Sequence, residues 1–234
     1  MAKITINKQN KVDSPTLILR NRSLENIGKI KNYEGLSYSE KLNESNTLSF
    51  TTYKEFNGIK NEYWDDIVDF KLLFIPEIHE QFQIKVSTNE ADSTTKEVTC
   101  TPLSEAELSQ VNLYNVAINT EDDKLRDGNV NVWDNYDVNF PTIFYRNPDR
   151  WMDYDWSDAK YSDTTVYTDE VKKKIIRNSS LLHRVLEKAV TYKIGYVQES
   201  LWNIFKEFTF DDADIYSALT STIAEEVGCL FIFD

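Results

Sequence analysis

The first half of the chain alternates apolar and polar residues in short segments, and this pattern restricts the fold more than any other feature of the sequence. A period of two places successive side chains on opposite faces of a β-strand, with one face in a core. The clearest such segments are residues 4–6, 16–19, 48–51 and 81–86. Turns are expected at residues 89–93 and at Asn57 and Gly58, a pair typical of a two-residue hairpin. The pattern predicts a mainly antiparallel β domain over about residues 1–105.

A sheet with open edges exposes unpaired backbone N–H and C=O groups, which pair readily with other chains unless they are covered. Two arrangements remove such edges: the strands close into a barrel, or neighbouring subunits complete a sandwich. We expect the barrel type. The expected fold class is therefore β-rich α+β, with an antiparallel β-barrel-type domain first and a smaller α/β domain after it.

Residues 106–170 differ in character from the strands before them. Between Glu121 and Glu170 the sequence has 13 acidic and 5 basic residues, a local net charge of −8, together with ten aromatic rings. Ten rings carry too much apolar surface to be left in water along a flexible linker. We expect this segment to be an ordered arm that packs against the barrel or against a partner subunit.

A solvated acidic surface is the ordinary interpretation of this arm, and two ligand-binding interpretations compete with it. Aromatic rings stack on sugar faces while carboxylates hold sugar hydroxyls, so a carbohydrate site is one alternative. Residues 153–158 loosely resemble a calcium loop, but they lack the central glycine and the terminal bidentate glutamate of an EF-hand. The calcium interpretation is therefore the weaker of the two.

The last third of the chain, residues 171–234, predicts a small α/β domain. Ser179 or Ser180 is expected to cap a helix, because a short hydroxyl side chain accepts a bond from the first helical N–H groups. The apolar residues of this helix are spaced to share one face, and they are Leu181, Leu182, Val185, Leu186 and Ala189. A short helical turn at residues 200–205 and an alternating strand at residues 207–210 follow.

A second helix and a final strand are expected to close this domain. Asp211 or Asp212 caps the helix, which ends at Gly228, the residue type favoured just past a helix C-terminus. Its apolar residues recur at intervals of four and are Ile215, Leu219, Ile223 and Val227. The apolar residues 229–233 then predict a strand, in which Cys229 is a small buried residue. A strand with no following turn favours an excised fragment of a longer protein over a natural end.

The sequence offers little for catalysis or metal binding. The cysteines and histidines, Cys100, Cys229, His79 and His183, are scattered singly, whereas a structural zinc site needs about four converging ligands. His183 adjoins an apolar helix face and His79 lies at an expected turn, so a surface or capping role is favoured for both over general-base chemistry. The 39 acidic residues make any acid pair of the glycosidase type uninformative. We assign no catalytic, cofactor-binding or metal-binding residue and expect no cofactor.

The net charge of −13 argues against a general nucleic-acid-binding protein, because binding phosphates needs clusters of Lys and Arg. No apolar stretch approaches the roughly 18 residues of a membrane span. The first eight residues contain no apolar core of a secretory signal. We expect synthesis in a cytosol and no membrane insertion from this segment.

Several stretches, in the same order along nearly the whole chain, resemble one family. They begin with LRNRSLENIGKI at residues 19–30 and LNESNTLSFT at residues 42–51. The later ones are residues 113–123, 141–148, 180–189, 192–197, 215–219 and 225–234. The chain resembles the N-terminal region of tail-tip hub proteins from phages and prophages of low-GC Gram-positive bacteria, also called minor structural proteins, tail-associated lysins or prophage tail endopeptidases. Residues 151–168 match less well and are interpreted as an insertion.

The resemblance implies a baseplate hub, in which β-barrel domains and smaller α/β domains form a homotrimeric ring. Such a ring joins the distal tail to the tip and lines the channel through which DNA leaves during infection. The expected partners are two further copies of the chain, the distal tail protein, the tape-measure protein and the tail tube, with DNA passing without tight binding. The expected location is the tail tip of the virion, after synthesis in the cytoplasm of the host bacterium.

No enzymatic activity is carried over from the resemblance. Family members that hydrolyse the cell wall do so with C-terminal domains, and none of the matching stretches is a catalytic signature. We expect a structural protein and not an enzyme. Two alternatives remain: the N-terminal part of a tail-associated cell-wall hydrolase, and a cell-wall carbohydrate-binding module built from the arm.

Overall fold

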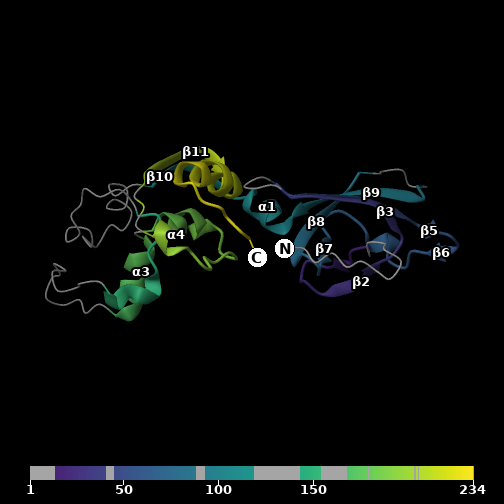
Figure 1. Ribbon diagram of the computed structural model, residues 1–234, viewed down its shortest axis with the longest axis horizontal. Coiled ribbons are helices and arrows are strands. Elements are labelled where there is room, and N and C mark those ends of the chain that lie inside the picture. Colours follow the sequence, from purple (N-terminus) through teal and green to yellow (C-terminus); the bar gives the residue numbers. More distant parts are fainter. Residues whose placement is uncertain are drawn as a thin grey trace. The chain divides into compact units, whose positions relative to one another are not determined.

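The computed structural model describes residues 14–40, 45–87, 93–118, 143–153, 168–178, 180–202, 204 and 206–233. The chain divides into two compact units, Met1–Ser109 with Leu219–Asp234, and Gln110–Ala218. Figure 1 shows the elements coloured along the sequence. The described part of the protein is β-rich, with one large antiparallel sheet and several short helices.

The first unit is built on a seven-stranded antiparallel sheet with the strand order β2-β1-β7-β8-β9-β4-β3. The strands are β1 (Leu17–Arg20), β2 (Asn26–Ile30), β3 (Tyr33–Ser39), β4 (Thr47–Tyr53), β7 (Leu72–Ile75), β8 (Glu80–Val86) and β9 (Thr95–Pro102), and α1 (Leu103–Leu108) follows β9. The alternation explains why they form: in β4, Leu48, Phe50 and Thr52 are buried and the residues between them are more exposed. The prediction of a mainly antiparallel β domain is confirmed, although residues 4–6 lie outside the described residues.

A small hairpin follows β4 in the chain. Its strands are β5 (Glu55–Phe56) and β6 (Ile59–Lys60). Asn57 and Gly58 form the turn with φ angles of 51° and 77°. Two successive positive φ angles define the type I′ turn that the Asn-Gly pair favours, so this turn is confirmed. The turn expected at residues 89–93 falls mostly outside the described residues.

The large sheet is strongly curved. β2 and β3 are its two edge strands, yet only Lys31 and Asn32 separate them in the chain. Seven strands about 4.8 Å apart would place the edges of a flat sheet roughly 29 Å apart. Three Cα–Cα steps span roughly 11 Å. The sheet therefore has to bend until its two edge strands approach each other at the link between β2 and β3.

Side-chain contacts between distant strands agree with this curvature. The Tyr38 hydroxyl of β3 donates to Glu80 Oε2 of β8 over 2.9 Å, although β4 and β9 lie between these strands. The Tyr38 ring also meets the Phe82 ring edge to face, with centroids 6.2 Å apart. Among the described residues no hydrogen-bond ladder joins β2 to β3, so the sheet is curled but a closed barrel is not found.

One apolar core occupies a single face of this curved sheet. Its buried members come from β1, β2, β4, β7, β8 and β9, with Ile67 added from the segment after β6, and they are Leu17, Leu19, Ile30, Leu48, Phe50, Ile67, Leu73, Ile75, Phe82, Ile84, Val98 and Cys100. Burial raises the pKa of the Cys100 thiol to about 12, so this cysteine is an unreactive core residue.

The segment between β6 and β7 is fastened to the sheet by Lys96. The short 3₁₀ helix η1 (Trp64–Asp66) lies in this segment. Lys96 Nζ donates to the carbonyl oxygens of Trp64 at 2.6 Å and Ile67 at 2.8 Å, and it sits 4.4 Å from the centroid of the Trp64 ring. Each polar contact of this partly buried ammonium therefore holds the loop in place.

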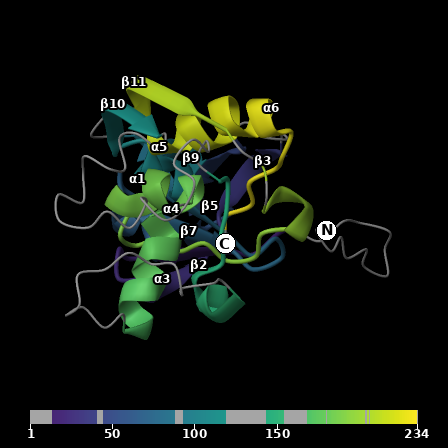
Figure 2. The same cartoon turned by 90° about the vertical axis from the view of Figure 1, so that its left-hand side faces the viewer.

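The second unit combines a two-stranded antiparallel sheet with short helices. β10 (Asn112–Ile118) pairs with β11 (Phe208–Asp214), and the two lie side by side in both views (Figures 1 and 2). The helical elements are η3 (Pro148–Asp153), α3 (Asp169–Asn178), α4 (Leu181–Val185), η4 (Leu186–Lys188), η5 (Glu199–Leu201) and α5 (Ile215–Ser217). The strand predicted at residues 207–210 is present within β11. The helical turn predicted at residues 200–205 is present at its start, in η5, while residues 203 and 205 lie outside the described residues.

The helix predicted after Ser180 is confirmed, but the hydroxyl of Ser180 does not cap it. Leu181, Leu182, Val185 and Ala189 are buried, as their spacing predicts, whereas Leu186 is only partly buried. Ser180 occupies the N-cap position without a side-chain capping bond. Its hydroxyl instead bonds the backbone of another segment, as described below.

The second predicted helix is also present, with a different cap. β11 continues through Asp211 and Asp212, so the prediction of a cap at either residue is wrong. Asp214 caps α5 instead, with Oδ1 accepting from Ser217 N at 2.8 Å. The π-helical turn η6 (Ala218–Ile223) and α6 (Ala224–Val227) continue the helix.

The end of this helix is as predicted, but the final strand is not. Gly228 ends the helix with a φ of 71°, the left-handed conformation that glycine adopts without strain. Residues 229–233 form no strand, Cys229 is only partly buried, and Ile232 is 79% exposed. An apolar run does not form a strand unless a neighbouring strand supplies hydrogen-bond partners, and none of the described strands forms a ladder with this run.

Candidate functional site

The residues weighed for chemistry do not converge. His79 lies in the turn between β7 and β8, as expected, with its ring 6.0 Å from that of Phe74. Cys100 is in the core of the first unit, and Cys229 follows α6. Within the described ranges no three His, Cys, Asp or Glu side chains are grouped to hold a metal ion.

Most of the acidic and aromatic arm lies outside the described residues, including residues 121–142 and 154–167. The calcium-loop interpretation of residues 153–158 therefore has no described geometry beyond its first residue. No helix in the described part is both long enough and apolar enough to cross a membrane.

A pocket of about 580 Å³ lies in the second unit, beside His183. Its lining comes from the segment that leads into η3, from α3 and α4, and from the irregular chain after η4, and it consists of Tyr145, Asn147, Pro148, Asp149, Arg177, His183, Leu186, Tyr192, Lys193, Ile194 and Gly195. The volume is within the range of roughly 300–1,000 Å³ that is typical of small-molecule sites.

Backbone bonds between two distant segments build the first wall of this pocket. Leu181 N donates to Ile143 O at 2.9 Å and Leu182 N donates to Phe144 O at 3.2 Å, so the first N–H groups of α4 find carbonyl partners outside the helix. Ser180 Oγ accepts from Arg146 N at 2.6 Å. These bonds hold the segment containing Tyr145 against α4.

Aromatic rings form the surface of that wall. The Tyr145 ring stacks on His183, with centroids 5.5 Å apart and an interplanar angle of 15°. Trp202 meets the same Tyr145 ring edge to face at 5.9 Å. Trp202 is fixed in turn by its indole N–H, which donates to Val197 O at 2.9 Å. The rings are therefore positioned by packing on one another.

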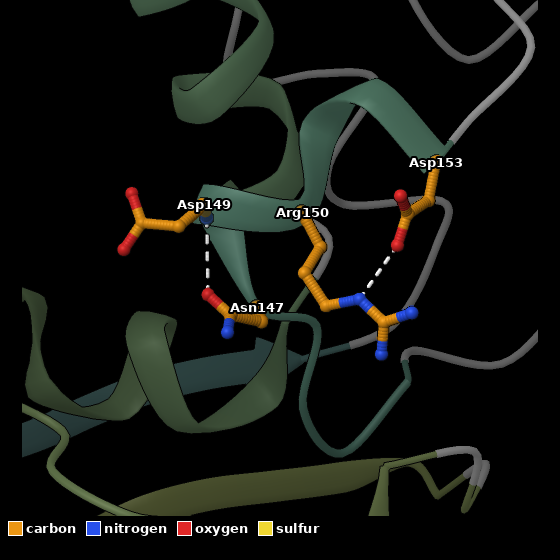
Figure 3. Close-up of polar contacts among 4 residues, drawn as sticks. All are labelled: Asn147, Asp149, Arg150 and Asp153. Carbon is orange, nitrogen blue, oxygen red and sulfur yellow. Dashed lines mark hydrogen bonds and ion pairs between the residues drawn. The ribbon is translucent and has the colours of Figure 1, made fainter.

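The turn at the start of η3 shapes the rim (Figure 3). Asn147 Oδ1 accepts from Asp149 N at 3.0 Å, which fixes the chain reversal at Pro148. Arg150 Nε contacts Asp153 Oδ2 at 2.6 Å on the exposed side of the turn. In Figure 3 the Asp149 carboxylate points away from Arg150. That carboxylate accepts from Lys173 Nζ of α3 at 2.8 Å.

The charges around the pocket are unequal. The hydrogen bond and the positive charge of Lys173 lower the pKa of Asp149, so this acid is ionised and paired at neutral pH. Arg177 and Lys193 add two positive charges to the lining. In a chain with a net charge of −13, this pocket is locally cationic.

His183 differs from its expected role as a surface or capping residue. It is half-buried and stacked, and burial, helped by the charge of Arg177, lowers its pKa to about 4. The ring is therefore neutral at pH 7, and a base with so low a pKa is poorly suited to proton transfer. Its Nδ1 atom is buried, and no hydrogen-bond partner for it lies among the described residues.

Sequence patterns could not have located this pocket. The contact between Tyr145 and His183 joins residues far apart in the chain, and no local spacing signals it. A comparison of the sequence with models of known protein families found no match, and a search of curated proteins found none either. The features that bear on function are therefore physical ones: the curved sheet of the first unit and the cationic, ring-lined pocket of the second.

Proposed function

We propose that this chain is a structural part of the tail tip of a bacteriophage or prophage of a Gram-positive host. In this proposal it belongs to a baseplate hub that joins the distal tail to the tip and lines the DNA exit channel. The ordered series of stretches that resemble tail-tip hub proteins supports it. The first of these stretches, residues 19–30, contains the end of β1, the turn after it and the whole of β2, which pairs with β1.

The observation that carries the proposal is the curvature of the seven-stranded sheet. Its edge strands β2 and β3 meet at a two-residue link, and a sheet bent in this way needs only one further pairing to become a barrel. The pairing is either between β2 and β3 or with strands of neighbouring copies. Barrel-type domains arranged in a ring are what a hub requires.

Charge and symmetry fit the same role. A channel wall rich in lysine would hold DNA by releasing counterions from its phosphates, whereas an acidic wall lets the strand pass. The net charge of −13 is of the suitable sign. A ring around a channel needs rotational symmetry, and we expect a homotrimer that contacts the distal tail protein, the tape-measure protein and the tail tube.

Labelling of intact virions tests this function. An epitope tag placed after Asp234, or at the matching position of the full-length gene product, is expected to bind antibody only at the tail end distant from the capsid. Averaged cryo-electron micrographs of that tip are expected to show threefold density. Labelling elsewhere on the particle, or particles that lack the protein, would overturn the proposal.

A cell-wall zymogram separates the proposal from the hydrolase alternative. The purified chain is expected to leave peptidoglycan intact, because a structural ring needs no catalytic residue. A cleared zone that disappears on mutating one acidic residue would replace the structural proposal with the enzymatic one.

A further inference from the structure

We propose that the pocket beside His183 binds a sugar that carries a negatively charged group, either a carboxylate or a phosphate. This inference goes beyond the structural role proposed above and does not depend on it. Two features of the described residues carry it: an excess of positive charge and aromatic side chains on the lining of one cavity of about 580 Å³.

His183 contributes its ring to the pocket. The ring is stacked on Tyr145 with centroids 5.5 Å apart and is neutral at pH 7, so it presents aromatic surface and no charge to the cavity. Its Nδ1 atom is closed to solvent, so a ligand in the pocket does not reach it.

The charge of the pocket calls for an anion. The one acidic side chain of the lining, Asp149, is already paired with Lys173 at 2.8 Å. Arg177 and Lys193 remain as positive charges on the lining. The planar guanidinium of Arg177 suits the two oxygens of a carboxylate or phosphate.

The apolar part of the lining suits a sugar better than it suits a small inorganic ion. Tyr145, His183 and Tyr192 contribute aromatic surface to the lining, and Leu186 and Ile194 contribute aliphatic surface. A bare phosphate would leave this surface without contacts. A pyranose ring presents C–H groups to the rings and hydroxyls to the polar atoms, so it uses both kinds of lining.

Nuclear magnetic resonance (NMR) can test binding at this position directly, because the chain has only two histidines. The chain, carrying no histidine tag, is titrated at constant pH 7 with glucuronic acid, glucose 6-phosphate, glucose and inorganic phosphate. The His183 signals are assigned by their loss in His183→Phe, which keeps a ring against Tyr145. At least one acidic sugar is expected to shift these signals saturably, with glucose and phosphate binding at least fivefold more weakly.

The two acidic sugars distinguish the two sources of charge. Tighter binding of glucuronic acid identifies a sugar acid, and tighter binding of glucose 6-phosphate identifies a sugar phosphate. Three results would overturn the proposal: no saturable shift with either acidic sugar, equal binding of inorganic phosphate, or equal binding of glucose.

Matched variants on one helix show whether charge at the pocket is responsible. Arg177→Gln is expected to weaken binding of the acidic sugar at least fivefold. Lys174→Gln removes an exposed cation of the same helix that does not line the pocket, and it is expected to change binding less than twofold. If both variants weakened binding of the acidic sugar equally, the effect would come from the overall charge of the chain. That result would contradict the proposed site.

Discussion

The two compact units use their polar side chains differently. In the first unit, Lys96 donates to the carbonyls of Trp64 and Ile67, and the buried Thr52 hydroxyl donates to Asn32 O at 2.8 Å. In the second unit, Nδ1 of His183 is buried beside a pocket and has no partner among the described residues. The first unit thus uses these polar groups to fix its own loops, whereas the second unit buries one polar atom that no described residue satisfies.

The largest expected effect comes from the core of the first unit. Phe82 of β8 is fully buried and contacts the Tyr38 ring. Phe82→Ala is expected to lower the free energy of unfolding by about 3–5 kcal/mol, because it removes apolar contacts and leaves a cavity. Chemical denaturation measures this loss. The matched variant Phe70→Ala, at a residue 56% exposed, is expected to cost less than about 1 kcal/mol. Equal losses would contradict the assignment of the core.

The second largest loss of stability is expected at a close packing contact in the same unit. Gly28 of β2 faces the Tyr63 ring, and a Cβ atom at residue 28 would overlap that ring. Gly28→Ala is expected to destabilise the protein by about 1–3 kcal/mol, because the Tyr63 ring has to move. Thermal melting tests this against Gly195→Ala, where a Cβ meets no atom within 4 Å. If the melting temperatures of both variants match the original protein, Tyr63 does not restrict residue 28.

His183 gives the second unit a pH-dependent stability. Its pKa of about 4 in the folded protein lies below the ordinary 6.5, so protonation favours the unfolded chain. The stability that depends on neutral His183 is complete above pH 6.5 and is lost as the pH falls to about 4. After allowance for its partial exposure, the expected loss is about 1–2 kcal/mol.

Denaturation of the protein and of His183→Phe at pH 7 and pH 4 isolates this contribution from those of the carboxylates. The variant is expected to lose less stability over that interval. In Arg177→Gln the pKa of His183 is expected to rise, because a neighbouring positive charge is removed. An unchanged pKa, followed by NMR, would show that burial alone sets its value.

The smallest effect is expected at the rim. The Arg150–Asp153 pair has a 2.6 Å contact, but its side chains are 54% and 53% exposed. Asp153→Asn is therefore expected to change the free energy of unfolding by less than about 0.5 kcal/mol, since water screens the pair. The same denaturation measurement checks this. A loss above about 1 kcal/mol would indicate that the turn in Figure 3 depends on the ion pair.

Local patterns predicted a substantial part of the fold. Strands β1, β4 and β8 follow the alternation at residues 16–19, 48–51 and 81–86, and the Asn57–Gly58 turn follows from the φ angles this pair tolerates. The helix after Ser180 and the glycine end at Gly228 follow from spacing and from conformational freedom. Each of these depends on residues close together in the chain.

The incorrect predictions concern choices between neighbouring alternatives. Three aspartates, Asp211, Asp212 and Asp214, can cap a helix, and pairing of β11 with β10 extends the strand far enough that Asp214 takes the position. Residues 229–233 are apolar enough for a strand but have no pairing strand among the described residues. In both cases a long-range contact, or its absence, decided the outcome.

By itself, the sequence determined the antiparallel β character of the first unit, its tight turn, the presence of helical segments over residues 181–189 and 215–227, and the end of the second at Gly228, because periodicity and backbone preference act over a few residues. Only the tertiary structure decided that β2 and β3 bend toward each other, and that Tyr145 stacks on His183 beside Arg177. The reason is physical: curvature and a pocket arise from bonds between segments far apart in the chain, such as Leu181 N to Ile143 O, and no local spacing encodes them.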